Sequence, residues 1–315
     1  MLGGKILIYK LILHLLVGIF LFILGIKILS SYFKKIATKR FKNIICNLTQ
    51  KKIIGVFIGI FITALIQSSS ATTVIVISLV HSGLLSLYSS VAIIMGANIG
   101  TTVTGQLIAF EVSNQIKYLL LICFILLPFY KNKIFKSIII IFFSLSLIFL
   151  GINSMSSGIT NLNGLAISNV INYLSNNFFL SISFGMFSVF IIHSSSTALA
   201  LLQIMTSTNM IKVTASIPII LGFNLGTCID AILGSLATNK LGKQAAFIHL
   251  IYNFLGIILI LPFIDIFYRF IRELSPGNYA RQIANFHSLF NIFATILILP
   301  FSNFLVKLSK FIIKD

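Results

Sequence analysis

Two short polar stretches stand inside long apolar runs of the chain. QSSSATT occupies residues 67–73 and HSSSTAL occupies 193–199, so a run of three serines occurs twice. Two further apolar runs hold GANIGTT at 96–102 and GFNLGTC at 222–228. The N–H groups at helix N-termini can bind an anion, and clustered hydroxyl and carbonyl oxygens can bind a hard cation such as sodium. We therefore predict that these four stretches form a site for small ions.

The four stretches are related by one ungapped offset. Ser68 to Ser194 and Asn98 to Asn224 span the same distance, 194 − 68 = 224 − 98 = 126 residues. Small residues and hydroxyls also serve close packing of membrane helices, and packing explains a single stretch about as well as binding does. Because both motifs repeat at one offset, an internal duplication that carries a binding site is the better interpretation.

The elements that carry these motifs must be transmembrane helices. Of the 315 residues, 58% are hydrophobic and only 9% are charged, and the mean hydropathy is +1.08, whereas a soluble domain is about one quarter charged. Apolar runs of about 20 residues recur along the chain, which predicts an all-α polytopic membrane protein with a single membrane transport domain, residues 1–315. The first run, 11–33, has the basic start of a signal peptide. Its core is too long and no small-residue cleavage site follows, so we expect the first transmembrane helix there.

Charge and cysteine content exclude several classes of protein. The formal charge of +18 comes from 23 basic against five acidic residues, but the basic residues lie at span ends and in loops, without a basic face. This placement is typical of topology determinants in a lipid bilayer and predicts no nucleic-acid partner. Cys46, Cys123 and Cys228 are odd in number and scattered, so neither a disulfide framework nor a transition-metal site is predicted. Assembly into a homo-oligomer stays open.

Each copy reads as a helix, a QSSS-type segment, a GxNxGT helix and a further helix. We place repeat 1 at about 6–130, repeat 2 at about 132–256 and an additional C-terminal helix at about 283–302. The uncharged segment 53–80 has its polar cluster in the middle, and it is either one tilted helix or a re-entrant hairpin of two half-helices.

The distribution of basic residues favours the hairpin. With both QSSS-type segments as hairpins, 15 basic residues fall on one side of the membrane and seven on the other. The richer side should be cytoplasmic, which puts the N-terminus outside and the C-terminus in the cytoplasm. Three crossings per unit is an odd number, so the second copy should be inverted relative to the first. The crossings are then seven, at roughly 11–33, 84–110, 118–130, 137–153, 213–238, 245–264 and 283–302.

Local chemistry predicts where the helices start. The serines at 68–70 lie just before the apolar run 71–80 and are suited to cap a half-helix, whose N-terminus carries about half a positive charge. Gly96 and Gly100 flank Asn98 and would permit a break in that span, so we expect both GxNxGT helices to be broken.

The four motifs resemble the paired signatures of the type II sodium-phosphate cotransporter family. The stretches AAFIHLIYNFLGIILILPF at 245–263 and ARQIANFHSLFNIFATILILPF at 280–301 are similar to its bacterial members, and the likeness covers about 11–302. It implies sodium-coupled symport of inorganic phosphate into the cell by alternating access in the plasma (inner) membrane, with sodium ions as co-transported ligands and no cofactor. Carried over residue by residue, it assigns the phosphate and sodium sites to Gln67, Ser68, Ser69, Ser70, Thr72, Thr73, Asn98, Thr101, Thr102, Ser194, Ser195, Ser196, Asn224 and Thr227.

Three features depart from the family pattern. His193 stands where the first copy has Gln67, Asp230 stands where it has Thr104, and the chain stops at Asp315 without the soluble regulatory domain that many bacterial members carry. An acid inside a membrane span is a functional candidate, so His193 and Asp230 join the predicted site. Because histidine titrates near neutrality, we hypothesise that His193, with Asp230, makes transport pH-dependent or lets a proton replace a sodium ion.

Other functions compete with this interpretation. The anion could be sulfate, arsenate or a carboxylate, with sodium or protons as coupling ions, or the protein could be an anion channel. An intramembrane serine hydrolase is disfavoured, because His193 adjoins Ser194 in sequence and no nucleophile elbow is present, so we predict no enzyme activity. The pairs His249 and Asn253, and His287 and Asn291, each share a helix face, which favours interhelical hydrogen bonding over metal ligation.

Overall fold

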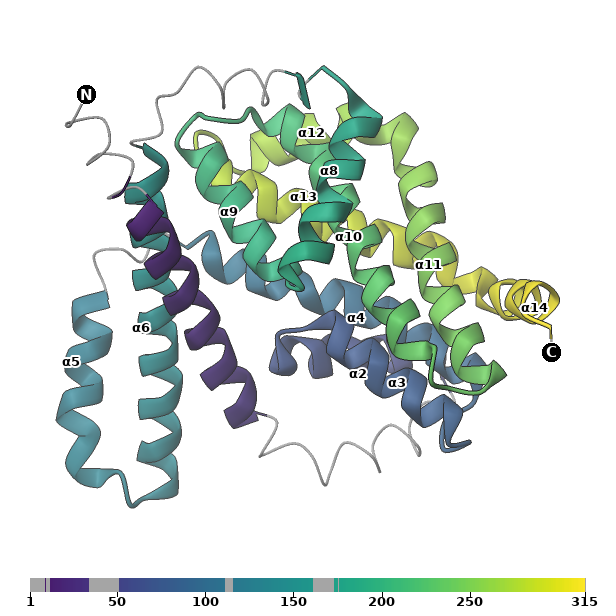
Figure 1. Cartoon of the computed structure of the whole chain (residues 1–315), viewed down its shortest axis with the longest axis horizontal. Coiled ribbons are helices and arrows are strands. Elements are labelled where there is room, and N and C mark those ends of the chain that lie inside the picture. The colour runs from purple at the N-terminus through teal and green to yellow at the C-terminus, as the bar shows by residue number, and fades with distance from the viewer. Residues whose placement is uncertain are drawn as a thin grey trace.

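The computed structural model describes residue 9 and residues 12–33, 51–110, 116–160, 173–174 and 176–314. Throughout these residues the regular structure is helical, and no strand occurs among them (Figure 1). Six helical stretches are long and apolar enough to cross a membrane, at Ile12–Phe33, Leu87–Ile108, Lys133–Ile159, Val213–Ser235, Lys240–Leu274 and Tyr279–Ile312. The prediction of an all-α polytopic membrane protein is therefore confirmed.

The N-terminal helix is Ile12–Phe33 (purple in Figure 1). The elements that follow it are α2 (Lys52–Ile66), α3 (Ser69–His81), α4 (Leu87–Ile108), α5 (Ile116–Leu126), η2 (Leu127–Phe129), α6 (Lys133–Thr160), α8 (Phe178–Ile192), α9 (Ser195–Ser207), α10 (Val213–Ser235), α11 (Lys240–Ile260), η3 (Leu261–Phe263), α12 (Ile264–Leu274), α13 (Tyr279–Ile298), η4 (Leu299–Phe301) and α14 (Ser302–Ile312). Six of the seven predicted crossings coincide with the long stretches. The seventh corresponds to α5 with η2, which is shorter. The direction of each crossing, and with it the inversion of the second copy, stays a prediction.

Helix boundaries recur along the chain at the offset of 126 residues. α2, α3 and α4 begin at residues 52, 69 and 87, and α8, α9 and α10 begin at 178, 195 and 213. The turns after the second helix of each copy also match, since Gly83 and Asn209 both have positive φ, 71° and 59°. The QSSS-type segments are thus helix–turn–helix units in both copies, and each is followed by its GxNxGT helix.

The GxNxGT helices are continuous, so the prediction that they are broken is wrong. α4 runs without interruption through Gly96 and Gly100, and α10 does the same through the equivalent glycines. A Cβ at Gly96 would lie 2.0 Å from the carbonyl oxygen of Val56 in α2, and one at Gly222 would lie 2.1 Å from that of Ile182 in α8. The glycines therefore let α2 and α8 approach α4 and α10 closely, which is the usual role of small residues between membrane helices.

A second, shorter repeat ends the chain. The first unit consists of α11, η3 and α12, which begin at residues 240, 261 and 264. In the second unit η4 and α14 begin at 299 and 302, which is 38 residues after η3 and α12. Each unit carries an H-x-x-x-N pair and then Leu-Pro-Phe at the 3-10 turn. Proline cannot donate a helix hydrogen bond, so it marks the point where each long helix gives way to a short one. α11 packs on α3 and α4, and α13 packs on α4 and α9, so this unit joins the two copies.

The N-terminal helix packs against α6, with α5 beside them, at one side of the bundle (Figure 1). Gly18 and Gly151 allow the contact between the N-terminal helix and α6, since a Cβ at Gly18 would lie 2.7 Å from the carbonyl oxygen of Gly151. Ser154 Oγ also donates a hydrogen bond of 2.8 Å to the carbonyl oxygen of His14. This contact fixes which face of the N-terminal helix points toward the serine turns.

Candidate functional site

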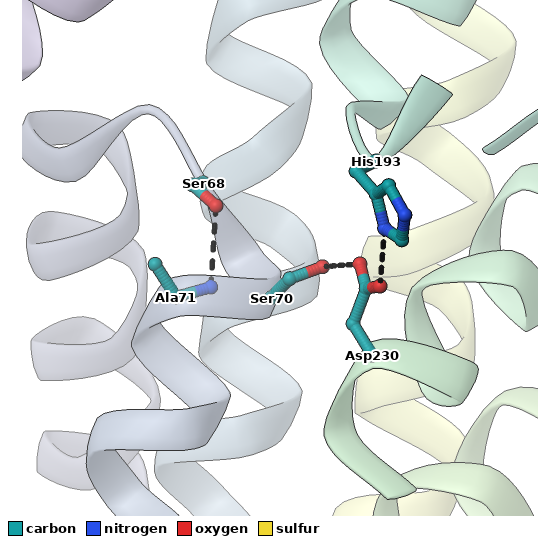
Figure 2. Close-up of polar contacts among 5 residues, drawn as sticks. All are labelled: Ser68, Ser70, Ala71, His193 and Asp230. Carbon is teal, nitrogen blue, oxygen red and sulfur yellow. Dashed lines mark hydrogen bonds and ion pairs between the residues drawn. The ribbon is translucent and has the colours of Figure 1, made fainter. Parts of the chain in front are cut away.

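The first serine turn joins α2 to α3. Gln67 ends α2 in the left-handed conformation, with φ 58° and ψ 27°, and Ser68 is extended. Ser68 Oγ accepts a hydrogen bond of 3.2 Å from the backbone N–H of Ala71, as Figure 2 shows. This is an N-cap, as predicted, and it directs the free N–H groups of the first turn of α3 toward the tip of the unit.

The second serine turn has the same geometry. His193 ends α8 with φ 52° and ψ 27°, and Ser194 caps α9 by accepting the backbone N–H of Thr197 at 3.2 Å. Left-handed conformations are uncommon for residues other than glycine, so their occurrence at both equivalent positions indicates that the tertiary structure holds the two turns. Each turn starts a helix of 13 residues, and each helix N-terminus carries about half a positive charge.

A cavity of about 420 Å³ lies between the two serine turns. Its walls come from both turns and from the N-terminal helix. The predicted site residues that line it are Gln67, Ser68, Ser70, His193, Ser194, Ser195 and Ser196. The structure therefore brings the two triple-serine stretches together, although they are 126 residues apart in the chain.

Asp230 lies beside this cavity and connects the two copies. Its Oδ2 accepts a hydrogen bond of 2.8 Å from Ser70 Oγ on α3, and its Oδ1 lies 3.2 Å from His193 Nδ1 (Figure 2). The side chain of Asp230 is 16% exposed and that of His193 is 64% exposed. The carboxylate is therefore largely withdrawn from solvent, and its two oxygens are engaged by groups from different copies.

The equivalent contact in the first copy is neutral. Gln67 Oε1 accepts a hydrogen bond of 2.6 Å from Thr104 Oγ1, and these two residues stand 126 positions before His193 and Asp230. In both copies the residue that ends the first half-helix thus contacts the GxNxGT helix. The two departures seen in the sequence are partners in one contact, with an imidazole and a carboxylate in place of an amide and a hydroxyl.

The other predicted site residues do not line the cavity. Ser69, Thr72 and Thr73 are buried within α3, and Thr72 Oγ1 donates to the carbonyl oxygen of Ser68 at 3.0 Å. The hydroxyls of Thr101, Thr102 and Thr227 donate to carbonyl oxygens of their own helices. Such back-bonding satisfies a hydroxyl in a membrane helix without a ligand.

The two motif asparagines bind neighbouring helices. Asn98 Nδ2 donates to Asn253 Oδ1 at 2.7 Å, and Asn98 Oδ1 lies 3.3 Å from His249 Nε2 on α11. Asn224 Nδ2 lies 3.5 Å from Asn291 Oδ1 on α13. The expected interhelical hydrogen bonding is thus present for His249 and both H-x-x-x-N asparagines. Among the described residues, no group of three or more His, Cys, Asp or Glu side chains could hold a metal ion, and the ring nitrogens of His287 have no partner.

Four polar residues that line the cavity were not among the predicted site residues, namely Lys27, Ser30, Ser31 and Thr197. Lys27 was visible in the sequence as a cation near the end of an apolar run. Intramembrane charges are functional candidates, so this was the available signal. The sequence pattern does not show which elements pack against that face of the N-terminal helix, because this depends on the tertiary structure.

The fold defines a polytopic membrane protein in which the serine turns of two equivalent helical units share one cavity. Two segments, residues 21–157 and 150–262, match the model of the Na+/Pi-cotransporter family. The chain belongs to this family, which is a family of transporters and not of enzymes, as the sequence resemblance implied. Membership points to phosphate transport and sets the hydrolase alternative aside. No solved structure matches the chain.

Individual relatives differ in how much of their length the chain covers. It is 32% identical over 264 residues to "Uncharacterized protein YqeW" of Bacillus subtilis (strain 168), covering 82% of this chain and 84% of that protein. It is 27% identical over 267 residues to "Putative inorganic phosphate export protein YjbB" of Escherichia coli (strain K12), covering 84% of this chain and 49% of that protein. Against "Sodium-dependent phosphate transport protein 2A" of Mus musculus the identity is 40% over 99 residues, 30% of this chain and 15% of that protein. The chain thus spans about half the length of the export protein.

Proposed function

We propose that this protein is a sodium-coupled symporter that carries inorganic phosphate into the cell across the plasma membrane by alternating access. The observation that carries the proposal is the single cavity of about 420 Å³ shared by the two serine turns. Two capped helix N-termini and several hydroxyls converge on it, which is the chemistry that binds phosphate oxygens. Family membership and the name of the mouse relative support phosphate and sodium as the ligands.

Coupling to sodium has a plain physical purpose. Moving a phosphate dianion into a cell at −100 mV costs about 2.3 kcal/mol per uncompensated charge, roughly 4.6 kcal/mol in all. Cations that bind with the anion remove this cost and add the free energy of their own gradient. Hydroxyl and carbonyl oxygens at the two turns offer sodium the hard ligands that it prefers. We propose that the phosphate and sodium ligands are among the predicted residues that line the cavity, with Asp230 beside them.

The proposal is tested by transport in proteoliposomes. An inward sodium gradient should drive labelled phosphate to a concentration above that outside, and replacing sodium by lithium, or by a proton gradient alone, should reduce accumulation at least tenfold. Equilibration without accumulation would instead identify an anion channel. If sulfate, arsenate or a small carboxylate competed more strongly than unlabelled phosphate, that anion would be assigned as the substrate instead.

A matched pair of serine variants ties this activity to the cavity. Ser195 lines the cavity, whereas Ser78 lies on the exposed part of α3, where its hydroxyl donates to the carbonyl oxygen of Val74. We expect Ser195→Ala to raise the KM for phosphate several-fold and Ser78→Ala to leave it unchanged. Equal effects of the two variants would remove the cavity from the transport path.

Export is the second candidate, because the relative YjbB is named a phosphate export protein. The same cavity serves either direction, since a symporter runs along the sum of its gradients. Cells that express the protein should take up labelled phosphate faster in sodium medium if it imports. Faster loss of preloaded label, with unchanged uptake, would establish export.

A further inference from the structure

Lys27 is a basic residue inside the N-terminal helix that also lines the cavity. It is the sole lysine, arginine, aspartate or glutamate between Ile12 and Phe33. Ile23, Ile26 and Ser30 from the same helix line the cavity with it. No carboxylate of the described residues forms an ion pair with Lys27. A cation in a membrane helix with no acidic partner, next to a cavity, calls for an anionic ligand.

The rest of the cavity is electropositive too. The N-termini of α3 and α9 open into it, each with a serine cap and unpaired first-turn N–H groups. Asp230 contacts two residues of the cavity wall, but it does not line the cavity itself, and its two oxygens contact Ser70 and His193. Lys27 therefore places a positive charge at the cavity, and no residue that lines it is an acid.

Ser196 provides an independent sign of a ligand. The residue is 3% exposed and lines the cavity, and its hydroxyl makes no hydrogen bond to the described residues. Its equivalent in the first copy, Ser70, donates to Asp230. Because the first copy has Thr104 in place of Asp230, Ser196 lacks that internal acceptor. A hydroxyl on the cavity wall without a protein acceptor is available to donate to a ligand in the cavity.

We propose that Lys27 is the counter-charge of the transported anion, and that its ammonium group and the Ser196 hydroxyl donate hydrogen bonds to phosphate oxygens in the cavity between the serine turns. This inference rests on the proposed function and adds to it a residue outside the duplicated motifs. The equivalent position in the second copy is the neutral Asn153, so the charge is supplied by one copy. A fixed cation at the site stabilises the anion while it is bound, through a charge-assisted hydrogen bond.

The first experiment compares three variants in sodium-driven phosphate uptake. Lys27→Gln should raise the KM for phosphate at least tenfold, because a charge-assisted hydrogen bond to phosphate is lost. Lys27→Arg should stay within about threefold of wild type. Lys117→Gln, which removes a lysine that lies over the Tyr118 ring at the start of α5, serves as the control and should leave the KM unchanged. An unchanged KM in Lys27→Gln overturns the inference.

The phosphate group that Lys27 binds could also belong to the headgroup of an anionic lipid. The uptake series is therefore run in phosphatidylcholine vesicles and in vesicles that contain one quarter phosphatidylglycerol. A free phosphate ligand predicts the same KM ratio between Lys27→Gln and wild type in both. A ratio near one in pure phosphatidylcholine, with an effect only when the anionic lipid is present, assigns Lys27 to the headgroup and overturns the inference.

A chemical rescue tests whether the positive charge at position 27 is what phosphate uptake requires. In Lys27→Cys, 2-aminoethyl methanethiosulfonate forms a mixed disulfide with the thiol, releases methanesulfinate and places an ammonium group at the position. It should lower the KM toward the wild-type value, whereas the neutral methyl reagent should not. The wild-type protein, which keeps its three native cysteines, is treated in parallel, so that reaction of the reagent at those cysteines can be subtracted.

Phosphate should also slow this modification, while sulfate at the same concentration slows it less. Protection by phosphate in a protein that fails to accumulate it would overturn the proposed symport and leave the role of Lys27 standing. Accumulation by wild type, with neither protection of Cys at position 27 nor a change of KM in Lys27→Gln, would overturn the role of Lys27 alone.

Discussion

The contact between His193 and Asp230 can be converted into the contact of the first copy. His193→Gln and Asp230→Thr together recreate the residues that form the Gln67–Thr104 hydrogen bond. Because the backbone at Gln67 and His193 is nearly identical, the new glutamine should reach the new threonine. We expect the double variant to be more stable than the sum of the single variants indicates.

The size of the effect follows from exposure and bond type. The imidazole of His193 is 64% exposed, so losing its pairing with the carboxylate should cost about 0.2–1 kcal/mol. Asp230→Thr removes the acceptor of the 2.8 Å bond from Ser70, and a hydrogen bond to a charged group is worth about 1.5–3 kcal/mol. In the double variant the pair is lost only once, and a neutral hydrogen bond worth roughly 0.5–1.5 kcal/mol is gained. The coupling energy is then about 0.7–2.5 kcal/mol in favour of the double variant.

Equilibrium unfolding in mixed detergent micelles at a fixed pH measures these four free energies. Circular dichroism is the suitable signal, since the chain contains no tryptophan. Independent sites add to within about 0.3–0.5 kcal/mol. A coupling energy smaller than this would show that His193 and Asp230 do not interact. It would also refute the structural equivalence of this contact in the two copies.

Variants of single residues test other parts of the structure. Gly96→Ala should yield no folded protein, because its Cβ would lie 2.0 Å from the Val56 carbonyl oxygen. The control Gly83→Ala has nothing within 4 Å of its Cβ, and at φ 71° it should lower the free energy of unfolding by only about 1 kcal/mol. Similar thermal stability of the two variants would contradict the close packing of α2 on α4. Asn98→Ala should lower the free energy of unfolding by about 2–3 kcal/mol, because it leaves two buried atoms, Asn253 Oδ1 and His249 Nε2, without a hydrogen-bond partner. A loss below 0.5 kcal/mol in the same unfolding assay would argue against that network. His193 is the one imidazole among the residues that line the cavity, so His193→Gln should flatten the dependence of phosphate uptake on pH. A variant that keeps the wild-type pH profile would exclude His193 as the source of that dependence.

The parts of the site that the sequence predicted are those that local chemistry determines. A serine before an apolar run caps a helix wherever that helix lies, so the N-caps at Ser68 and Ser194 were predictable without tertiary information. The offset between the motifs then predicted equivalent turns, and the matching backbone angles at Gln67 and His193 agree with it.

The errors arose where a residue's role depends on what packs against it. Glycine permits a helix break and also permits close helix contact, and the sequence of α4 alone does not distinguish the two. The carbonyl oxygen of Val56, 2.0 Å from a Cβ at Gly96, decides for contact. In the same way the amide side chain of Asn98 could bind an ion, but its hydrogen bonds are to residues of α11. Lys27 was not predicted, because the sequence does not show that the N-terminal helix lines the cavity.

The outer helices of the two copies are not placed equivalently. On the N-terminal helix, Ile23 and Lys27 line the cavity between the serine turns. The equivalent positions on α6, Phe149 and Asn153, line a different cavity of about 490 Å³ together with Ser207 at the end of α9. The internal parts of the copies match closely in backbone geometry, so the difference lies in how each outer helix meets the core. In a transporter built from duplicated halves, the two halves can adopt two different arrangements of outer helix and core. When the halves exchange these arrangements, access to the site changes from one side of the membrane to the other. This asymmetry supports the proposed alternating access, and it places the counter-charge on the outer helix that engages the serine turns in the state described.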